Sequence, residues 1–184
     1  SFVVANPSIE LKDFFNVAIH EYIHIYQNAH NLHGGNSDIG LTLWLGEGST
    51  EVLAHYLASK KGRSNYKLYL KESLTTALKL REKFPGIGIK NSHDHESLER
   101  LLRQCPEECF GPLLYETGAI ATAFLIRNNS FNHFYKRYIP SIAYLGGEKA
   151  FKKAFGLSLN DFYYRFEKFL NLPEEEQLDY LSLN

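Results

Sequence analysis

Apolar residues recur at steps of three and four positions from Leu11 to Tyr26. Such spacing places the apolar side chains on one side of an α-helix. We expect this helix to begin after a cap at Asn6 or Ser8 and to end at the glycine pair 34–35, because glycine disfavours continuation of a helix. A long amphipathic helix is therefore the first element that the chain must accommodate.

The remainder of the chain is also predicted to be helical. The β-branched apolar run at residues 2–6 favours a short N-terminal strand. Further helices are expected at about 43–60, 65–83, 95–104, 113–129, 130–139, 147–155 and 158–171. The helix at 113–129 is apolar nearly all round, which is typical of a central buried helix. The predicted fold class is mainly α, or α+β with a minimal β part.

The composition limits both the domain organisation and the partners. With 184 residues, 44% of them hydrophobic, the chain can bury a core without disulfides or structural metals, so we expect one domain over residues 1–184. A formal net charge of −1 gives no electrostatic case for nucleic acid, and no apolar stretch is long enough for a membrane span. The chain starts at Ser1 and contains no methionine, which favours a piece of a longer protein with an upstream domain.

The segment HEYIH, residues 20–24, has the spacing of a metal site. Residues four apart lie one turn along the same helix face, so His20 and His24 can direct both imidazoles at one zinc ion. Glu21 lies on the adjoining face, where its carboxylate can reach a water at the metal without ligating the metal, as a general base does. The alternative is a helix surface with two solvated histidines.

A catalytic zinc site needs a third protein ligand, and the segment WLGEGSTE offers Glu47. We expect Glu47 at the start of the second helix, near Trp44, with Gly46 and Gly48 allowing close approach of two backbones. The alternative is that Glu47 only favours a helix N-terminus, as acidic residues do. Glu51 follows one turn later and is expected either to hydrogen-bond the outer nitrogen of a ligating histidine or to be a solvated helix residue.

HEYIH followed by WLGEG resembles the gluzincin metallopeptidases, and in particular the aminopeptidase N-type enzymes with their WLxEG segment. The resemblance implies that His20, His24 and Glu47 bind one catalytic Zn²⁺ and that Glu21 is the general base. Here 22 residues separate His24 from Glu47, which is longer by four than the aminopeptidase N-type pattern. The segment 154–170 also resembles the closing helix of peptidase MA-like domains, so the resemblance implies a zincin-like helical catalytic domain.

A third segment, YETGA at residues 115–119, resembles the Y-E-x-G-A segment of the same enzymes. The resemblance implies that Tyr115 stabilises the oxyanion formed during hydrolysis. A phenol near the start of a helix and beside a polarised carbonyl is a suitable hydrogen-bond donor for that purpose. Because the chain has 12 tyrosines, a packing role for Tyr115 is the alternative.

The other histidines and the two cysteines are expected to have local roles. His55 lies one turn beyond Glu51 and is expected to pack. Solvated or capping roles are expected for His30, His33, His93, His95 and His133. Cys105 and Cys109 fit a disulfide or two free thiols equally well.

The sequence thus predicts a zinc-dependent metallopeptidase that acts on peptide or protein substrates with Glu21 as general base. Two alternatives are a non-catalytic zincin scaffold that binds a partner, and a zinc hydrolase of a non-peptide amide or ester. The chain lacks the G-x-M-E-N segment with which aminopeptidase N-type enzymes recognise a free amine, so exopeptidase activity is not implied. The compartment is not fixed by the sequence, with an extracytoplasmic location slightly favoured.

Overall fold

The computed structural model describes residues 11–30, 39–93 and 95–181. The predicted strand at 2–6, the cap at Asn6 or Ser8 and the glycine pair 34–35 lie outside these ranges. The helices are α1 (Leu11–Ala29), α2 (Ile39–Lys60), α3 (Tyr66–Lys83), the 3₁₀ helix η1 (Ile89–Ser92), α4 (His95–Gln104), α5 (Glu107–Pro112), the π-helix η2 (Leu113–Thr117), α6 (Gly118–Arg127), α7 (Phe131–His133), the π-helix η3 (Phe134–Tyr138), α8 (Ile139–Leu145), α9 (Gly147–Phe155), α10 (Leu159–Phe169) and α11 (Glu174–Leu181). Within the described ranges no strand occurs, so the prediction of a mainly α chain is confirmed.

Two of the predicted helices begin at side-chain caps. The Asn65 side chain accepts a hydrogen bond from the Leu68 N–H at the start of α3, at 3.0 Å. The Ser158 hydroxyl accepts one from the Asp161 N–H at the start of α10, at 3.1 Å. Each cap satisfies a backbone donor that the first turn of a helix leaves without an internal partner.

The C-terminal end of α2 is fixed by glycine. Gly62 has a positive φ of 66°, which a residue without a Cβ adopts at little cost. The Arg63 N–H donates to the Ala58 carbonyl and the Gly62 N–H donates to the Ser59 carbonyl, each at 3.0 Å. This pair of bonds is the Schellman arrangement that ends many helices.

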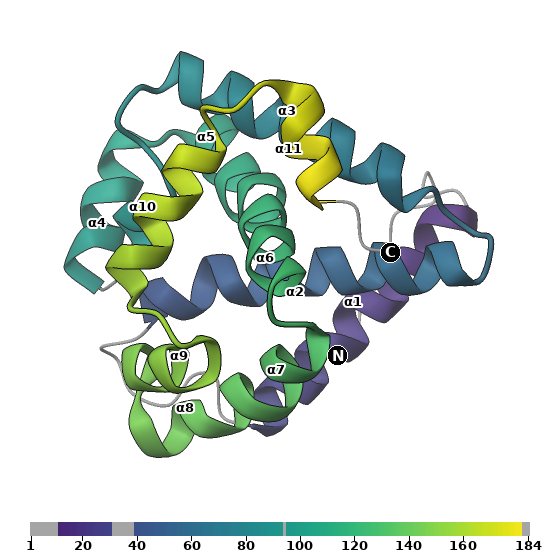
Figure 1. Cartoon of the computed structure of the whole chain (residues 1–184), viewed down its shortest axis with the longest axis horizontal. Helices are drawn as coiled ribbons and strands as arrows, with labels where there is room; N and C mark the ends of the chain where they lie inside the picture. The colour runs from purple at the N-terminus through teal and green to yellow at the C-terminus, as the bar shows by residue number, and fades with distance from the viewer. Residues whose placement is uncertain (1–10, 31–38, 94, 182–184) are drawn as a thin grey trace.

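The helix α6 lies at the centre of the fold, and α2, α3, α10 and α11 surround it (Figure 1). Its residues from Ala119 to Ala123 are at most 1% exposed, which confirms the expected central buried helix. On one side Phe124 packs against the rings of Phe162, Phe166 and Phe169 from α10, with centroids 4.9–6.1 Å apart. Aromatic packing of this kind supplies much of the apolar burial in a small domain.

The backbones of α2 and α6 touch at two glycines. A Cβ on Gly48 would overlap the backbone of Gly118, and a Cβ on Gly118 would lie 2.8 Å from the Trp44 carbonyl oxygen. The close approach expected at Gly48 is therefore present, and its partner is Gly118. The same expectation for Gly46 is wrong, because a Cβ there would meet its nearest neighbour only at 3.9 Å. Glycine is required at positions 48 and 118, because any side chain there would push the helices α2 and α6 apart.

Several helix limits differ from the prediction, and the helices α5 and α8 were not expected. The helix α1 ends at Ala29, earlier than the glycine pair at which the sequence predicts its end. The helix α2 begins at Ile39, four residues before the expected start. The helix α11 was not predicted, although three glutamates after Pro173 are typical of a helix N-terminus.

Cys105 and Cys109 form a disulfide, with their Cα atoms 5.3 Å apart, so of the two sequence-based alternatives the structure contains the bonded one. It joins the end of α4 to α5, and both residues are buried. The helical run Glu107–Arg127 is long and apolar enough to cross a membrane by length and composition, and 67% of its apolar window is buried inside the protein. A core helix meets the same criteria, so the absence of a membrane span stays a prediction.

Candidate metal centre

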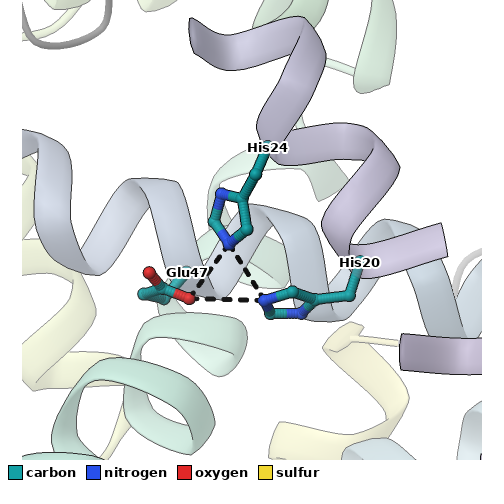
Figure 2. Close-up of side chains that lie close together, drawn as sticks. All are labelled: His20, His24 and Glu47. Carbon is teal, nitrogen blue, oxygen red and sulfur yellow. Dashed lines mark hydrogen bonds and ion pairs between the residues drawn. The ribbon is translucent and has the colours of Figure 1, made fainter. Parts of the chain in front are cut away.

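Three side-chain atoms from two helices converge on one point. His20 and His24 extend from α1, and Glu47 extends toward them from α2 (Figure 2). The two Nε2 atoms lie 2.9 Å apart, and Glu47 Oε2 lies 3.4 Å from Nε2 of His20 and 3.3 Å from Nε2 of His24. The side chains of these three residues form a group that could hold a metal ion, and among the described residues it is the one group of His, Cys, Asp or Glu side chains close enough to do so. The structure thus brings together the three predicted ligands.

The spacing of the three atoms suits zinc. For nitrogen and oxygen ligands at about 2.0–2.1 Å from the ion, the corners of a tetrahedron lie about 3.3 Å apart. The observed separations of 2.9, 3.3 and 3.4 Å are close to that edge length. Two imidazole nitrogens and one carboxylate oxygen are also a common donor set of catalytic zinc sites with three protein ligands.

The hydrogen bonds of the outer ring nitrogens favour the same conclusion. Nδ1 of His20 lies 2.7 Å from Glu51 Oε1, and Nδ1 of His24 lies 2.8 Å from Gln27 Oε1. Carboxylate and amide oxygens only accept, so in each ring Nδ1 carries the proton. A neutral ring then has a lone pair on Nε2. Two lone pairs and the carboxylate oxygen of Glu47 therefore face one another, and this arrangement is repulsive unless a cation lies between them.

Without a metal, protons supply the positive charge. Burial lowers the pKa of His20, but hydrogen bonds and charge interactions with Glu47 and Glu51 outweigh burial and raise this pKa to about 9. The hydrogen bond to Glu47 raises the pKa of His24 against the effect of burial. Burial raises the pKa of Glu47, yet the two histidines lower it to about 2. The carboxylate of Glu47 therefore stays ionised and pairs with the protonated imidazole of His20 at neutral pH.

Zinc affinity should consequently depend on pH. Zinc binds only the neutral imidazole, and the metal-free protein holds a proton on His20 up to about pH 9. As pH rises from 7 to 9 this competition weakens, so we expect the affinity to increase by about tenfold per pH unit for each proton released, and to level off above that range. Chelator-buffered zinc titrations across this range measure the slope. An affinity that is constant between pH 7 and pH 9 would contradict the assignment of His20 as a ligand.

Helix periodicity explains why these side chains meet. His20 and His24 lie four residues apart on α1, and Glu47 and Glu51 lie four residues apart on α2, so each helix presents two side chains on one face. Glu47 was expected at a helix start, and this is wrong. It lies in the interior of α2, well beyond the first turn, so its alternative role at the helix N-terminus is also excluded.

Two tyrosines hold α1 and α2 in register. The Tyr26 hydroxyl on α1 donates to the Tyr135 carbonyl at 2.7 Å, and the Tyr135 hydroxyl on η3 donates to the Ser49 carbonyl of α2 at 3.1 Å. The bonded residues lie close in sequence to His24 and Glu47. These two hydrogen bonds fix the distance between the ligand-bearing segments.

The predicted base and the predicted oxyanion donor line one pocket beside the centre. Glu21 and Tyr115 both border a cavity of about 360 Å³, together with His20, Glu51, His55, Asn16, Val17 and Ala54. The ring of Tyr115 lies 6.3 Å from the ring of His20, centroid to centroid, and its side chain is 41% exposed. Tyr115 is thus not part of the buried core, and its role in hydrolysis stays a prediction.

The position of Tyr115 differs from the prediction in one respect. It lies in the π-helix η2, inside the continuous helical run from α5 to α6, and not near a helix start. π-helical turns are rare and occur frequently at functional sites. Burial raises the pKa of Tyr115, and the charges of Glu47, Glu51 and Glu21 raise it further. The phenol therefore keeps its proton at neutral pH, as a hydrogen-bond donor must.

The remaining histidines make local contacts. His55 stacks on the ring of Tyr69 at 3.7 Å, and its Nε2 lies 3.6 Å from Glu51 Oε2. The rings of the other three described histidines contact oxygens three or four residues earlier, as follows: His30 to Tyr26 O, His93 to Lys90 O and His133 to Ser130 Oγ. His33 and the side chain of His95 lie outside the described part of the chain.

Sequence reasoning missed Gln27. Its side chain is 2% exposed and contacts both His24 and the backbone of α2. The available signal was its spacing, because residue 27 lies three positions after His24 and shares its side of the helix. A polar residue on that buried side needs hydrogen-bond partners, and one of its neighbours is a metal-ligand candidate.

No known protein family, curated protein or solved structure matches this chain.

Proposed function

We propose that the protein is a zinc-dependent peptide hydrolase of the gluzincin type. The observation that carries the proposal is the convergence of His20 Nε2, His24 Nε2 and Glu47 Oε2 within 3.4 Å of one another, in a chain whose first ligand is followed directly by Glu21. Two imidazole nitrogens and one carboxylate oxygen directed at one point suit a divalent ion, and a glutamate directly after the first ligand suits a general base beside that ion.

The side chains divide the work of hydrolysis between them. Zinc, when bound, supplies a positive charge that lowers the pKa of water and polarises a carbonyl group. Glu21, which lines the pocket beside His20, takes one proton from the attacking water. It then delivers this proton to the leaving amine nitrogen as the carbon–nitrogen bond breaks.

Tyr115 acts on the other atom of the scissile carbonyl. As the carbonyl oxygen gains negative charge, the phenol donates a hydrogen bond to it, and such donors are worth about 10²–10³-fold in rate. The raised pKa of Tyr115 keeps this proton in place. Glu51 holds the Nδ1 proton of His20 and so keeps the Nε2 lone pair available to the metal.

The proposal is tested with a mixed peptide pool and zinc-loaded protein, analysed by mass spectrometry beside the Glu21→Gln variant. The glutamine side chain has nearly the shape of glutamate, but its amide cannot accept the proton from water. We therefore expect zinc to remain bound and cleavage to fall by roughly 10²–10⁴-fold. Glu72→Gln, on the exposed surface of α3, is the matched control and should cleave as the wild type does.

The outcomes separate the proposal from its rivals. Cleavage by the wild type and by Glu72→Gln, but not by Glu21→Gln, supports the peptidase and shows whether cuts fall inside chains or at their ends. Equal cleavage by Glu21→Gln would remove Glu21 as the base. Stoichiometric zinc with no peptide cleaved would favour a binding domain or a hydrolase of other amides or esters.

A further inference from the structure

Gln27 lies between the two helices that carry the ligands. It belongs to α1, at 2% exposure, and its side chain spans the interface with α2. A buried amide must satisfy both its N–H donors and its carbonyl acceptor, or it costs free energy. The partners of this amide therefore decide its orientation.

The nitrogen end of the amide is directed at α2. Nε2 of Gln27 lies 3.1 Å from the Gly46 carbonyl oxygen, from Ser49 Oγ and from Thr50 Oγ1. The hydroxyls of Ser49 and Thr50 themselves donate to the Gly46 carbonyl, at 3.2 and 2.6 Å. Each hydroxyl uses its one proton in this bond, so toward Gln27 its oxygen can only accept. The group of Gln27 that faces the two hydroxyls must therefore be the N–H donor end of the amide.

The oxygen end of the amide is consequently directed at His24. Gln27 Oε1 lies 2.8 Å from Nδ1 of His24 and can only accept a hydrogen bond. Nδ1 must then carry the ring proton, which leaves the lone pair on Nε2, the atom that faces Glu47. The polar groups of α2 therefore determine, through one amide, which nitrogen of His24 is free to bind a metal.

We propose that Gln27 is the positioning residue of the metal centre, because it fixes the tautomer and ring orientation of His24 and attaches that ring to α2 next to Glu47. This inference rests on the proposed zinc site. Gln27 acts on His24 as Glu51 acts on His20, but it also donates to the Gly46 carbonyl, directly before Glu47. One side chain thus aligns a nitrogen ligand on α1 with the oxygen ligand on α2.

The test compares the zinc dissociation constants of the wild type, Gln27→Met and Gln27→Glu by chelator competition. Methionine retains the length of the side chain but cannot accept from His24, so we expect affinity to fall by about 10–100-fold. A carboxylate accepts from His24 Nδ1 but cannot donate to Gly46. Gln27→Glu should therefore recover most of the lost affinity if the contact with His24 is what matters.

Two further measurements separate positioning from a loss of fold. Gln177→Met is the matched control, because Gln177 on α11 is also fully buried. Its side-chain N–H donates to the carbonyl of Phe169 on α10 at 3.0 Å. Its zinc affinity should equal that of the wild type. In ¹⁵N-labelled zinc-loaded protein, the Nδ1–H of His24 should give a slowly exchanging proton signal in the wild type and in Gln27→Glu, and this signal should be lost in Gln27→Met.

Wild-type affinity in Gln27→Met, or equal weakening in Gln27→Met and Gln27→Glu with the His24 signal unchanged, would overturn the role of Gln27 and leave the proposed hydrolase intact. A wild-type protein that binds no zinc would overturn both. The two failures are therefore distinguishable in the same experiment.

Discussion

Replacing Glu47 by alanine should lower the affinity for zinc by roughly a thousandfold. Structural zinc binds zinc-finger peptides with about 10–16 kcal/mol shared among four ligands, so loss of one protein ligand should remove up to about 4 kcal/mol, which is three powers of ten. Glu47 is the only oxygen ligand in the cluster, and its Oε2 lies within 3.4 Å of both histidine nitrogens. Metal content after dialysis and chelator competition measure the effect.

The control for Glu47→Ala is Glu82→Ala, which removes an exposed carboxylate from α3. This control should bind zinc as the wild type does, and both variants should have wild-type helical content by circular dichroism. If Glu47→Ala retained stoichiometric zinc with an unchanged dissociation constant, the three-residue centre would be the wrong site.

Replacing Gly48 by alanine should destabilise the protein by at least about 4 kcal/mol. Single substitutions have effects this large only through a few mechanisms, and severe overpacking of the core is one of them. The added Cβ would overlap the backbone of Gly118, and backbone atoms in two packed helices cannot move aside as a flexible side chain can. Denaturant and thermal unfolding of the metal-free protein measure the loss.

Gly46→Ala is the matched control, since it lies two residues earlier on the same helix. A Cβ there meets its nearest neighbour, Gln27 Oε1, at 3.9 Å, which is ordinary contact. Alanine also favours a helix over glycine by up to about 1 kcal/mol, so this variant should be as stable as the wild type or more stable. If Gly48→Ala were within about 1 kcal/mol of Gly46→Ala, the described contact of α2 with α6 would be incorrect.

The parts of the site that lie within one helix could be predicted from the sequence. The four-residue spacing of His20 and His24, and of Glu47 and Glu51, fixes their common faces whatever the helices pack against. The contact of Glu51 with His20 follows once the two faces meet, and the structure places those atoms 2.7 Å apart. The catalytic roles inferred for these residues stay predictions.

The parts that depend on how helices pack could not be predicted. Nothing in the sequence pairs Gly48 with Gly118, because 69 residues separate them and their contact is a property of the assembled fold. Gln27 was missed for the same reason, because its hydrogen-bond partners are a carbonyl and two hydroxyls of another helix. The helix α2 extends back to Ile39 through Gly40 and Thr42, residues of low helix propensity, so local preference does not predict its start.

The two ligand-bearing helices differ in how much of their described surface faces solvent. The helix α2 is locked to α6 by the glycine contact, whereas α1 presents Phe14, Tyr22 and Ile25 to solvent on its outer side at 49%, 72% and 52% exposure. Both nitrogen ligands and the base belong to α1, and the oxygen ligand belongs to α2. A bound ion would join the two helices through their side chains, and its binding free energy would oppose any local opening that separates α1 from α2.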